Sequence, residues 1–256
     1  MHTDIVDLRQ FYSSRLGHLA EQSITAALRT VWPRLPDERL VGLGYAVPFL
    51  DSFFEGTERT FAFMPAPQGA VNWPVGAKSA TALVFDEELP LPDASIDRVL
   101  MVHCLEFAEN PVETLKEIWR VLAPGGRLVI VVPNRRGLWA RLEHTPFGSG
   151  RPYSRGQLTG LLRQTNFTPG AFAEALLFPP SPHGYMLKPW RTLEAIGRRL
   201  WPAFSGVTVV EAQKRLYQGL PVAARASRRV FVPVLSPQGV PTTRMPVSLD
   251  KRPFRD

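Results

Sequence analysis

Residues 85–134 read FDEELPLPDASIDRVLMVHCLEFAENPVETLKEIWRVLAPGGRLVIVVPN. Two apolar, β-branched runs within them, Ile96–Val102 and Arg127–Val132, have the length of strands that are buried on both faces. Between these runs, Asn110–Leu122 carries apolar residues at the spacing of one helical face. Pro124 cannot continue that helix, and the glycines after it allow an exit through a positive φ. The pattern predicts a strand–helix–strand unit of a parallel sheet with a right-handed crossover.

The rest of the chain continues this alternation. Apolar positions recur at helical spacing in residues 4–32, 153–165 and 188–201, and Ser154 is the predicted N-cap of the second of these segments. Further strands are predicted at Arg39–Leu43, Thr60–Met64, Ala80–Phe85, Phe172–Phe178 and Val207–Tyr217. A chain ordered in this way belongs to the α/β class.

Composition excludes several kinds of protein. With 256 residues, 45% of them hydrophobic, the chain is long enough for one domain with a substantial core. No apolar run has the length of a membrane span, and the N-terminus lacks the pattern of a signal peptide. Cys104 is the only cysteine, and the histidines have no metal-ligand spacing. We therefore expect a cytoplasmic protein with no metal site.

Positive charge is concentrated near the C-terminus. Seven basic and two acidic residues follow Gln218, so this part carries +5 of the net charge of +7. It is rich in proline and has no sustained periodicity, which predicts a disordered basic tail. The tail either aids solubility or binds an acidic protein or surface. Its few aromatic residues argue against nucleic acid.

Two segments resemble the later half of the class I S-adenosylmethionine-dependent methyltransferase domain: Leu89–Phe107, LPLPDASIDRVLMVHCLEF, and Glu117–Asn134, EIWRVLAPGGRLVIVVPN. Residues 4–217 are similar to bacterial proteins with a type 11 methyltransferase domain. The resemblance implies a Rossmann-like, doubly wound sheet of seven strands, six parallel and the last antiparallel, with helices on both faces. It also implies S-adenosyl-L-methionine as cofactor and a small-molecule acceptor. The expected domains are a helical cap (1–38), the methyltransferase domain (39–217) and the tail (218–256).

The family's glycine-rich turn after the first strand corresponds to LVGLGYA in this chain. Gly42 and Gly44 match the family pattern, and Ala46 stands where the third glycine is expected. Leu40 stands at the acidic position of the motif. Glycine is needed there because the backbone must approach the ligand closely. The resemblance therefore implies cofactor contacts at Gly42, Gly44 and Ala46, without the usual carboxylate.

A second carboxylate is also missing. In the family, the second strand ends in an acid that binds both ribose hydroxyls, but Met64 stands there. Each lost charge-assisted hydrogen bond costs about 1.5–3 kcal/mol. Asp86 or Glu87, after the third strand, is expected to bind the adenine amino group; the alternative is an exposed acidic turn. Substitute contacts are predicted in the loop after the second strand, at Gln68, Asn72 and Trp73; the alternative is that this loop packs over the sheet edge.

Two histidines are candidate bases. His103 directly follows the fourth strand, where acceptor-side residues lie in this family, so it is a candidate for both cofactor binding and catalysis. A packed or capping histidine is the alternative. His144 is the second candidate. It lies in a long loop, NRRGLWARLEHTPFGSGRPYS, that follows the fifth strand.

The same loop concentrates positive charge at the expected substrate entrance. Arg135, Arg136 and Arg151, with Tyr153, are the predicted substrate-binding residues. Guanidinium groups bind carboxylates and phosphates, so an anionic acceptor is predicted. The alternative is a short helix, Arg136–Leu142, whose arginines point into water. A second functional hypothesis is a degenerate methyltransferase-like scaffold that binds a partner protein, which the missing acids at Leu40 and Met64 favour.

Overall fold

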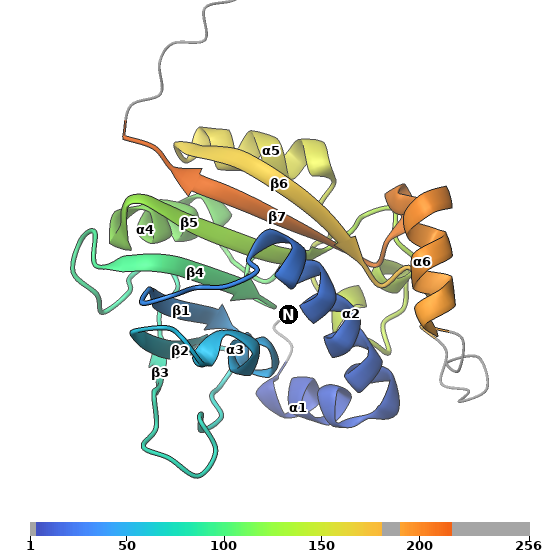
Figure 1. The fold of residues 1–256 in the computed structure, drawn as a ribbon, viewed down its shortest axis with the longest axis horizontal. Coiled ribbons are helices and arrows are strands. Elements are labelled where there is room, and N and C mark those ends of the chain that lie inside the picture. Colours follow the sequence, from blue (N-terminus) through green and yellow to red (C-terminus); the bar gives the residue numbers. More distant parts are fainter. Residues whose placement is uncertain (1–3, 181–189, 217–256) are drawn as a thin grey trace, which may run out of the picture. The chain divides into compact units, whose positions relative to one another are not determined.

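The computed structural model describes residues 4–180 and 190–216, so the predicted basic tail lies outside the described residues. Seven strands form one sheet in the order β3-β2-β1-β4-β5-β7-β6 (Figure 1). Their bounds are β1 Arg39–Gly44, β2 Arg59–Pro65, β3 Thr81–Val84, β4 Ile96–Val102, β5 Leu122–Pro133, β6 Phe167–Ala175 and β7 Val207–Lys214. β7 pairs antiparallel with β5 and β6, and the pairings among β1 to β5 are parallel. The predicted seven-stranded sheet is confirmed.

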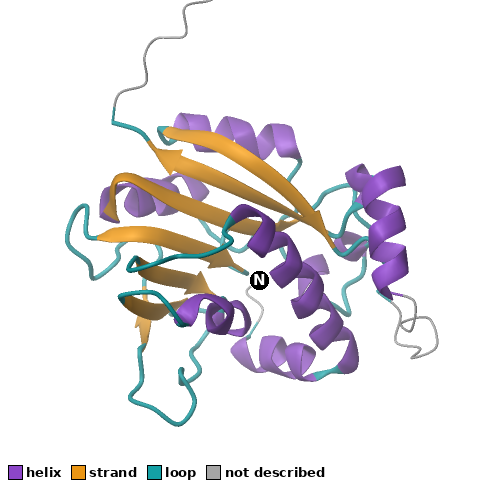
Figure 2. Ribbon diagram, in the orientation of Figure 1, coloured by secondary structure: helices purple, strands orange, loops and turns teal. Residues whose placement is uncertain are grey.

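Helices cover both faces of the sheet (Figure 2). Their bounds are α1 Ile5–Ser13, α2 Arg15–Val31, α3 Val47–Phe54, α4 Pro111–Val121, α5 Arg155–Gln164 and α6 Trp190–Leu200, with short 3-10 turns η1 Trp139–Arg141, η2 Pro146–Gly148 and η3 Pro202–Phe204. Neighbouring strand residues face opposite sides. On β1, Leu40 packs in the core beneath α2 and α3, whereas Val41 packs in the core beneath α4 and α5. The cores on the two faces are therefore built from alternate residues of the same strands.

Three local predictions need correction. The helix exit through a positive φ does not occur at the end of α4, because Leu122 is already extended and pairs with Ile96 as the first residue of β5. The positive φ is found later, at Gly125. The predicted strand at 172–178 begins earlier, at Phe167, and the predicted short helix after β5 is only the 3-10 turn η1. Ser154 caps α5 as predicted, with a complete capping box.

Candidate functional site

The carboxyl ends of the parallel strands meet at one edge of the sheet, which is where ligands bind in doubly wound folds. A cavity of about 290 Å³ opens there. Its lining comes from the residues that follow β2, β3 and β4, and includes Pro65, Gln68, Phe85, Asp86, Glu87, His103 and Cys104. We call it the strand-end cavity. It brings together four predicted site residues: Gln68, Asp86, Glu87 and His103.

The glycine turn lies beside this cavity but outside its lining. Gly44 has a φ of +81°, and a Cβ there would lie 2.3 Å from the carbonyl oxygen of Val102. A Cβ on Gly42 would lie 2.9 Å from that of Ala46, which is itself buried. The close packing around β1 therefore requires glycine at positions 42 and 44, independently of any contact with a ligand.

Both positions that lack the family's carboxylates are buried. Leu40 is fully enclosed in the core. Met64 is equally buried, and its sulfur accepts a hydrogen bond from the backbone N–H of Val71 at 3.3 Å. Neither side chain lines the strand-end cavity, so the structure does not bring Met64 to the predicted cofactor site.

The two acids after β3 differ in their surroundings. Asp86 accepts a hydrogen bond from the Thr114 hydroxyl at 2.8 Å, which ties it to the first turns of α4. Glu87 is exposed at the cavity and has no hydrogen bond or ion pair to another described residue. Phe85, next to them, exposes 70% of its surface. An exposed aromatic ring beside a free carboxylate is a suitable lining for a planar base with an amino group.

Gln68 is held in one orientation although it lies in a loop. Its amide nitrogen donates to the carbonyl oxygen of His103 at 2.9 Å, and its own backbone carbonyl accepts from the Ile5 N–H at 2.9 Å. A carbonyl can only accept, so the side-chain nitrogen must face His103. The amide oxygen then remains free, and it has no partner among the described residues.

His103 lies at the centre of a buried polar group. Its φ is +50°, and only 1% of its surface is exposed. Its Nε2 lies 2.8 Å from the Tyr12 hydroxyl, and its Nδ1 lies 3.3 Å from a carboxylate oxygen of Glu106. Burial raises the pKa of Tyr12 well above its ordinary value, so the phenol keeps its proton. Neither Nδ1 nor the Glu106 carboxylate has a hydrogen-bond partner among the described residues, so the Tyr12 hydroxyl is the hydrogen-bond partner of the ring, through Nε2.

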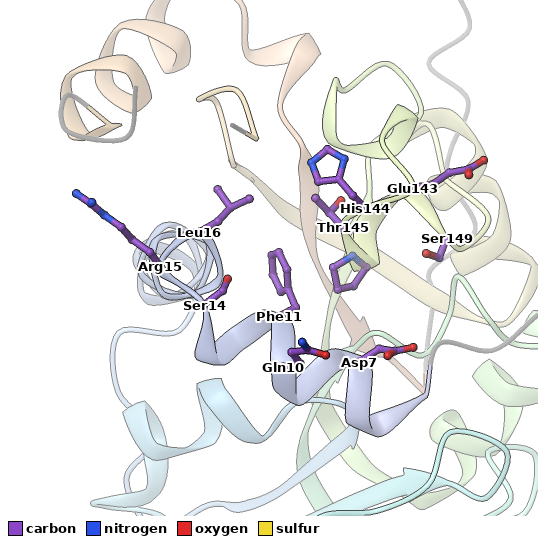
Figure 3. A pocket seen from close by; sticks show the side chains of 11 residues that line it. Asp7, Gln10, Phe11, Ser14, Arg15, Leu16, Glu143, His144, Thr145 and Ser149 are labelled. Carbon is purple, nitrogen blue, oxygen red and sulfur yellow. The ribbon is translucent and has the colours of Figure 1, made fainter. Parts of the chain in front are cut away.

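A second cavity, of about 530 Å³, lies between the α1–α2 junction and the loop at 143–149 (Figure 3). We call it the helix-side cavity. His144 and Phe11 line it, and the Phe11 ring points from α1 toward Thr145 and His144. The Phe147 ring centroid lies 4.9 Å from that of His103 and 6.0 Å from that of Phe11. Phe147 therefore connects the surroundings of His103 to this second cavity.

The predicted substrate-binding residues do not meet in one place. Arg136 lines a third cavity with Asn134, Arg155 and Glu174, away from both cavities described above. Arg135 and Arg151 are exposed and line none of the three cavities. Tyr153 is buried and donates to the Leu105 carbonyl at 3.3 Å. Backbone pairing of Asn134 with Tyr153, and of Arg151 with Glu106, holds the two ends of the loop, while its middle, with His144, reaches the helix-side cavity.

Some site residues were missed by the sequence analysis. The pairing of Tyr12 with His103 joins residues 91 positions apart, and no pattern in the sequence links them. Phe85 could have been found, since it ends a predicted strand beside three consecutive acids. No group of three metal-ligating side chains occurs within residues 4–180 and 190–216. In the same residues no helix is both long and apolar enough to cross a membrane.

Comparison with known proteins gives partial sequence matches and a fold match. Residues 74–130 match the family model of the methyltransferase domain. Over 82 residues the chain is 44% identical to a Mycolicibacterium smegmatis protein named "Probable S-adenosylmethionine-dependent methyltransferase". That match covers 31% of this chain and 32% of the relative, so the chain spans about a third of the length of that relative.

Two solved structures share the fold over most of the chain. An S-adenosylmethionine-dependent methyltransferase from Thermotoga maritima matches with a TM-score of 0.55 and 20% identity, over 82% of this chain and 96% of its own. A chain from the complex between the Haloferax volcanii Trm112 methyltransferase activator and a methyltransferase matches with a TM-score of 0.62 and 19% identity, over 84% and 100%. These findings confirm the resemblance seen in the sequence.

Proposed function

We propose that this chain, a class I S-adenosylmethionine-dependent methyltransferase by its fold and its matched segment, transfers a methyl group from S-adenosyl-L-methionine to a small-molecule acceptor. The observation that carries the proposal is the strand-end cavity. It lies at the carboxyl ends of β2, β3 and β4, and its lining combines an aromatic ring, a free carboxylate and a buried imidazole. The cofactor, when bound, supplies an activated methyl group on its sulfonium, so that alignment with the acceptor is the main task of the protein.

The residues around the strand-end cavity fit the adenosine part of the cofactor. Phe85 offers an exposed ring to the adenine, and Glu87 offers an unpaired carboxylate to its amino group. Gln68 lines the same cavity, and its buried amide oxygen, which has no partner among the described residues, would accept from a ribose hydroxyl once the side chain turns toward the cavity. The chain therefore has polar groups that replace the family's carboxylates, and these come from positions other than Leu40 and Met64.

His103 is the proposed base for an acceptor that loses a proton. Its Nε2 is capped by Tyr12 of α1, and Glu106 faces the opposite ring nitrogen. An acceptor hydroxyl or amine that replaces the Tyr12 phenol would place its proton within reach of Nε2. The helix-side cavity, which contains His144, is the proposed route of entry because Phe11 and Phe147 connect it with His103.

The structure gives no support to the predicted preference for an anionic acceptor. That preference rested on Arg135, Arg136 and Arg151, which do not line the helix-side cavity. The lining of this cavity combines Arg15 with the carboxylates of Asp7 and Glu143. We therefore propose a small-molecule acceptor without assigning it a negative charge.

A methyltransferase-like scaffold that binds a partner protein is the second candidate. The burial of Leu40 and Met64 favours it, since both positions that usually carry cofactor-binding acids are filled by core side chains. Among the solved neighbours, the Haloferax volcanii chain comes from a complex with a methyltransferase activator. The two candidates differ in one measurable property, which is cofactor binding.

Calorimetric titration with S-adenosylmethionine and S-adenosylhomocysteine separates them. We expect micromolar binding that Phe85→Ala weakens about tenfold, the loss of one aromatic contact of roughly 1.4 kcal/mol. Leu83→Ala is the matched control, because Leu83 is also an exposed apolar residue at β3 but does not line the cavity. No heat and no thermal stabilisation at millimolar ligand would contradict the enzyme and leave the scaffold.

A further inference from the structure

One side of α6 is fixed to the body of the molecule by specific contacts. The buried Glu194 carboxylate accepts from the Ser23 hydroxyl at 2.6 Å and from the Leu177 N–H at 2.8 Å. One turn later, a Cβ on Gly197 would lie 2.7 Å from the Leu177 Cβ. These contacts set the rotation of the helix about its axis. The opposite side is therefore a defined outer surface of the molecule.

This outer surface exposes large apolar side chains. Ile196 and Leu200 are four residues apart and so share one side of α6, with exposed fractions of 42% and 64%. Trp201 and Phe204, in the turn that follows, are 43% and 60% exposed. We call these four side chains, together with the exposed Arg199, the α6 face. Arg191 and Arg198 are exposed on the flank of α6 that faces α2, where they line a cavity with Ser23 and Ala26.

The exposed charge of α6 has one sign. Arg191, Arg198 and Arg199 are exposed and form no ion pair with another described residue. The only acid of the helix is Glu194, whose carboxylate is buried and used by Ser23 and Leu177. A helix end with exposed Trp, Phe and Leu side chains and with arginines that form no ion pair to a described residue has the composition of an interfacial element.

We propose that the α6 face binds to the surface of an acidic lipid bilayer. The arginine side chains would lie at the level of the anionic headgroups, and the apolar side chains would enter the boundary between headgroups and acyl chains. This binding is peripheral, and it is independent of the proposed methyl transfer.

Charge argues against the other occupants. Residues 181–189 contain a lysine and no acid, and the tail after Gln218 carries a net +5, so neither segment is attracted to this face. In a symmetric dimer formed through this face, the arginines of one copy would lie against the arginines of the other. A nucleic acid would satisfy the arginines but leave Leu200 and Phe204 in water. An acidic bilayer satisfies both the charged and the apolar groups.

The α6 face is linked to the candidate site by a row of aromatic rings. Successive ring centroids lie 4.9, 5.6, 5.5 and 5.9 Å apart along His103, Phe147, Trp139, Phe178 and Trp190. The last of these rings begins α6. A bilayer bound at α6 would therefore lie at the same end of the molecule as the cavities.

The test is vesicle co-sedimentation of the full chain with phosphatidylcholine alone and with phosphatidylcholine containing phosphatidylglycerol. We expect binding that increases with the phosphatidylglycerol fraction. Leu200→Ser/Phe204→Ser should weaken it about tenfold, and Arg198→Gln/Arg199→Gln should weaken it similarly and reduce its dependence on the anionic lipid. The matched controls are Val75→Ser, at an apolar residue that is 91% exposed elsewhere, and Arg163→Gln, at an exposed arginine of α5.

The basic tail could hold the protein on acidic vesicles without α6. Insertion of the α6 side chains into the bilayer is therefore measured separately. Brominated lipids should quench the fluorescence of the wild type, and Trp201→Phe should remove most of that quenching. The proposal is overturned if the two α6 double variants bind like their controls, if no quenching occurs, or if no vesicle is bound. Equal thermal midpoints and equal S-adenosylhomocysteine binding in all variants would separate this result from folding and from the proposed function.

Discussion

His103 connects the groups around the strand-end cavity through both ring nitrogens and its carbonyl oxygen. Tyr12 contacts Nε2, Glu106 faces Nδ1 and Gln68 donates to the carbonyl. From the sequence, the place of His103 at the end of β4 could be predicted because it directly follows an apolar run. Its partners could not, since Tyr12 belongs to a helix whose packing depends on the finished sheet. The carboxylates missing at Leu40 and Met64 were visible in the sequence, but the proposal that Gln68 replaces them depends on its hydrogen bonds in the structure.

Replacing Gln68 tests whether its side chain takes the place of the carboxylates that are missing at Leu40 and Met64. We expect Gln68→Leu to raise the Kd for S-adenosylhomocysteine about tenfold, the loss of one buried hydrogen bond of roughly 1.4 kcal/mol. Asn72→Leu makes the same chemical change in the same loop, at an exposed residue that does not line the cavity, and should leave the Kd unchanged. Calorimetry measures both. The assignment fails if the wild type and Gln68→Leu discriminate equally between S-adenosylhomocysteine and its 2′- and 3′-deoxy analogues.

Cys104 predicts a loss of stability at alkaline pH. Burial, and then the negative charges of Asp86 and Glu106, raise the pKa of this thiol well above its ordinary value of 9.0. Above pH 9.0 the unfolded thiol ionises while the folded thiol keeps its proton, so the unfolded state binds fewer protons. The contribution of the Cys104 thiol to the free energy of unfolding is complete below pH 9.0. It is lost as the pH rises, at up to about 1.4 kcal/mol per pH unit.

Urea unfolding of Cys104→Ala between pH 8 and about 10.5 measures this contribution. We expect the free energy of unfolding of the variant to decline less steeply above pH 9 than that of the wild type. Tyr12 has a raised pKa for the same reason and should add a second decline above pH 10.0, so its Phe variant serves as a comparison. Parallel curves for the wild type and Cys104→Ala would contradict the account.

At the scale of elements, local chemistry explains what could be predicted. Ser154 caps α5 because its hydroxyl accepts from Gln157 while the Gln157 side chain accepts from Ser154, and both residues are visible in the sequence. The start of β6 could not be predicted, because Pro169 and Gly170 interrupt the pattern of a strand. The structure accommodates them at an irregularity between Pro169 and Phe172, on the edge strand of the sheet, where a missing N–H is tolerated.

The turn between β1 and α3 gives a prediction at this scale. Gly44→Ala would place a Cβ against the Val102 carbonyl at a φ of +81°, so we expect a loss of more than about 2 kcal/mol of stability. Gly160→Ala is the matched control. It lies within α5 with nothing near its added Cβ, and should stabilise by up to about 1 kcal/mol. Thermal unfolding compares them, and equal effects would show that the turn is not constrained.

At the scale of the whole molecule, the two edges of the sheet have different roles. The carboxyl edge carries the cavities, whereas an ionic network joins elements at or near the opposite edge. Arg98, near the start of β4, donates two hydrogen bonds of 2.7 Å to Glu38 and lies over the Trp32 ring of the segment after α2. Glu211 of β7 accepts from the Trp32 indole at 3.0 Å and from Arg127 at 2.9 Å. Side chains from distant parts of the sequence are thus fixed together away from the site.

This separation predicts that stability and ligand binding can be changed independently. Arg98 is only 15% exposed, so Arg98→Met should leave the Glu38 carboxylate without its partner and cost about 2 kcal/mol or more. Arg59→Met is the matched control, because its pair with Glu58 is long, at 4.0 Å, and largely exposed, and should cost under about 0.5 kcal/mol. Urea unfolding measures the difference, while the Kd for S-adenosylhomocysteine should stay the same in both variants. A change in that Kd with Arg98→Met would mean that the network positions the strand ends, and that the two edges are coupled through β4.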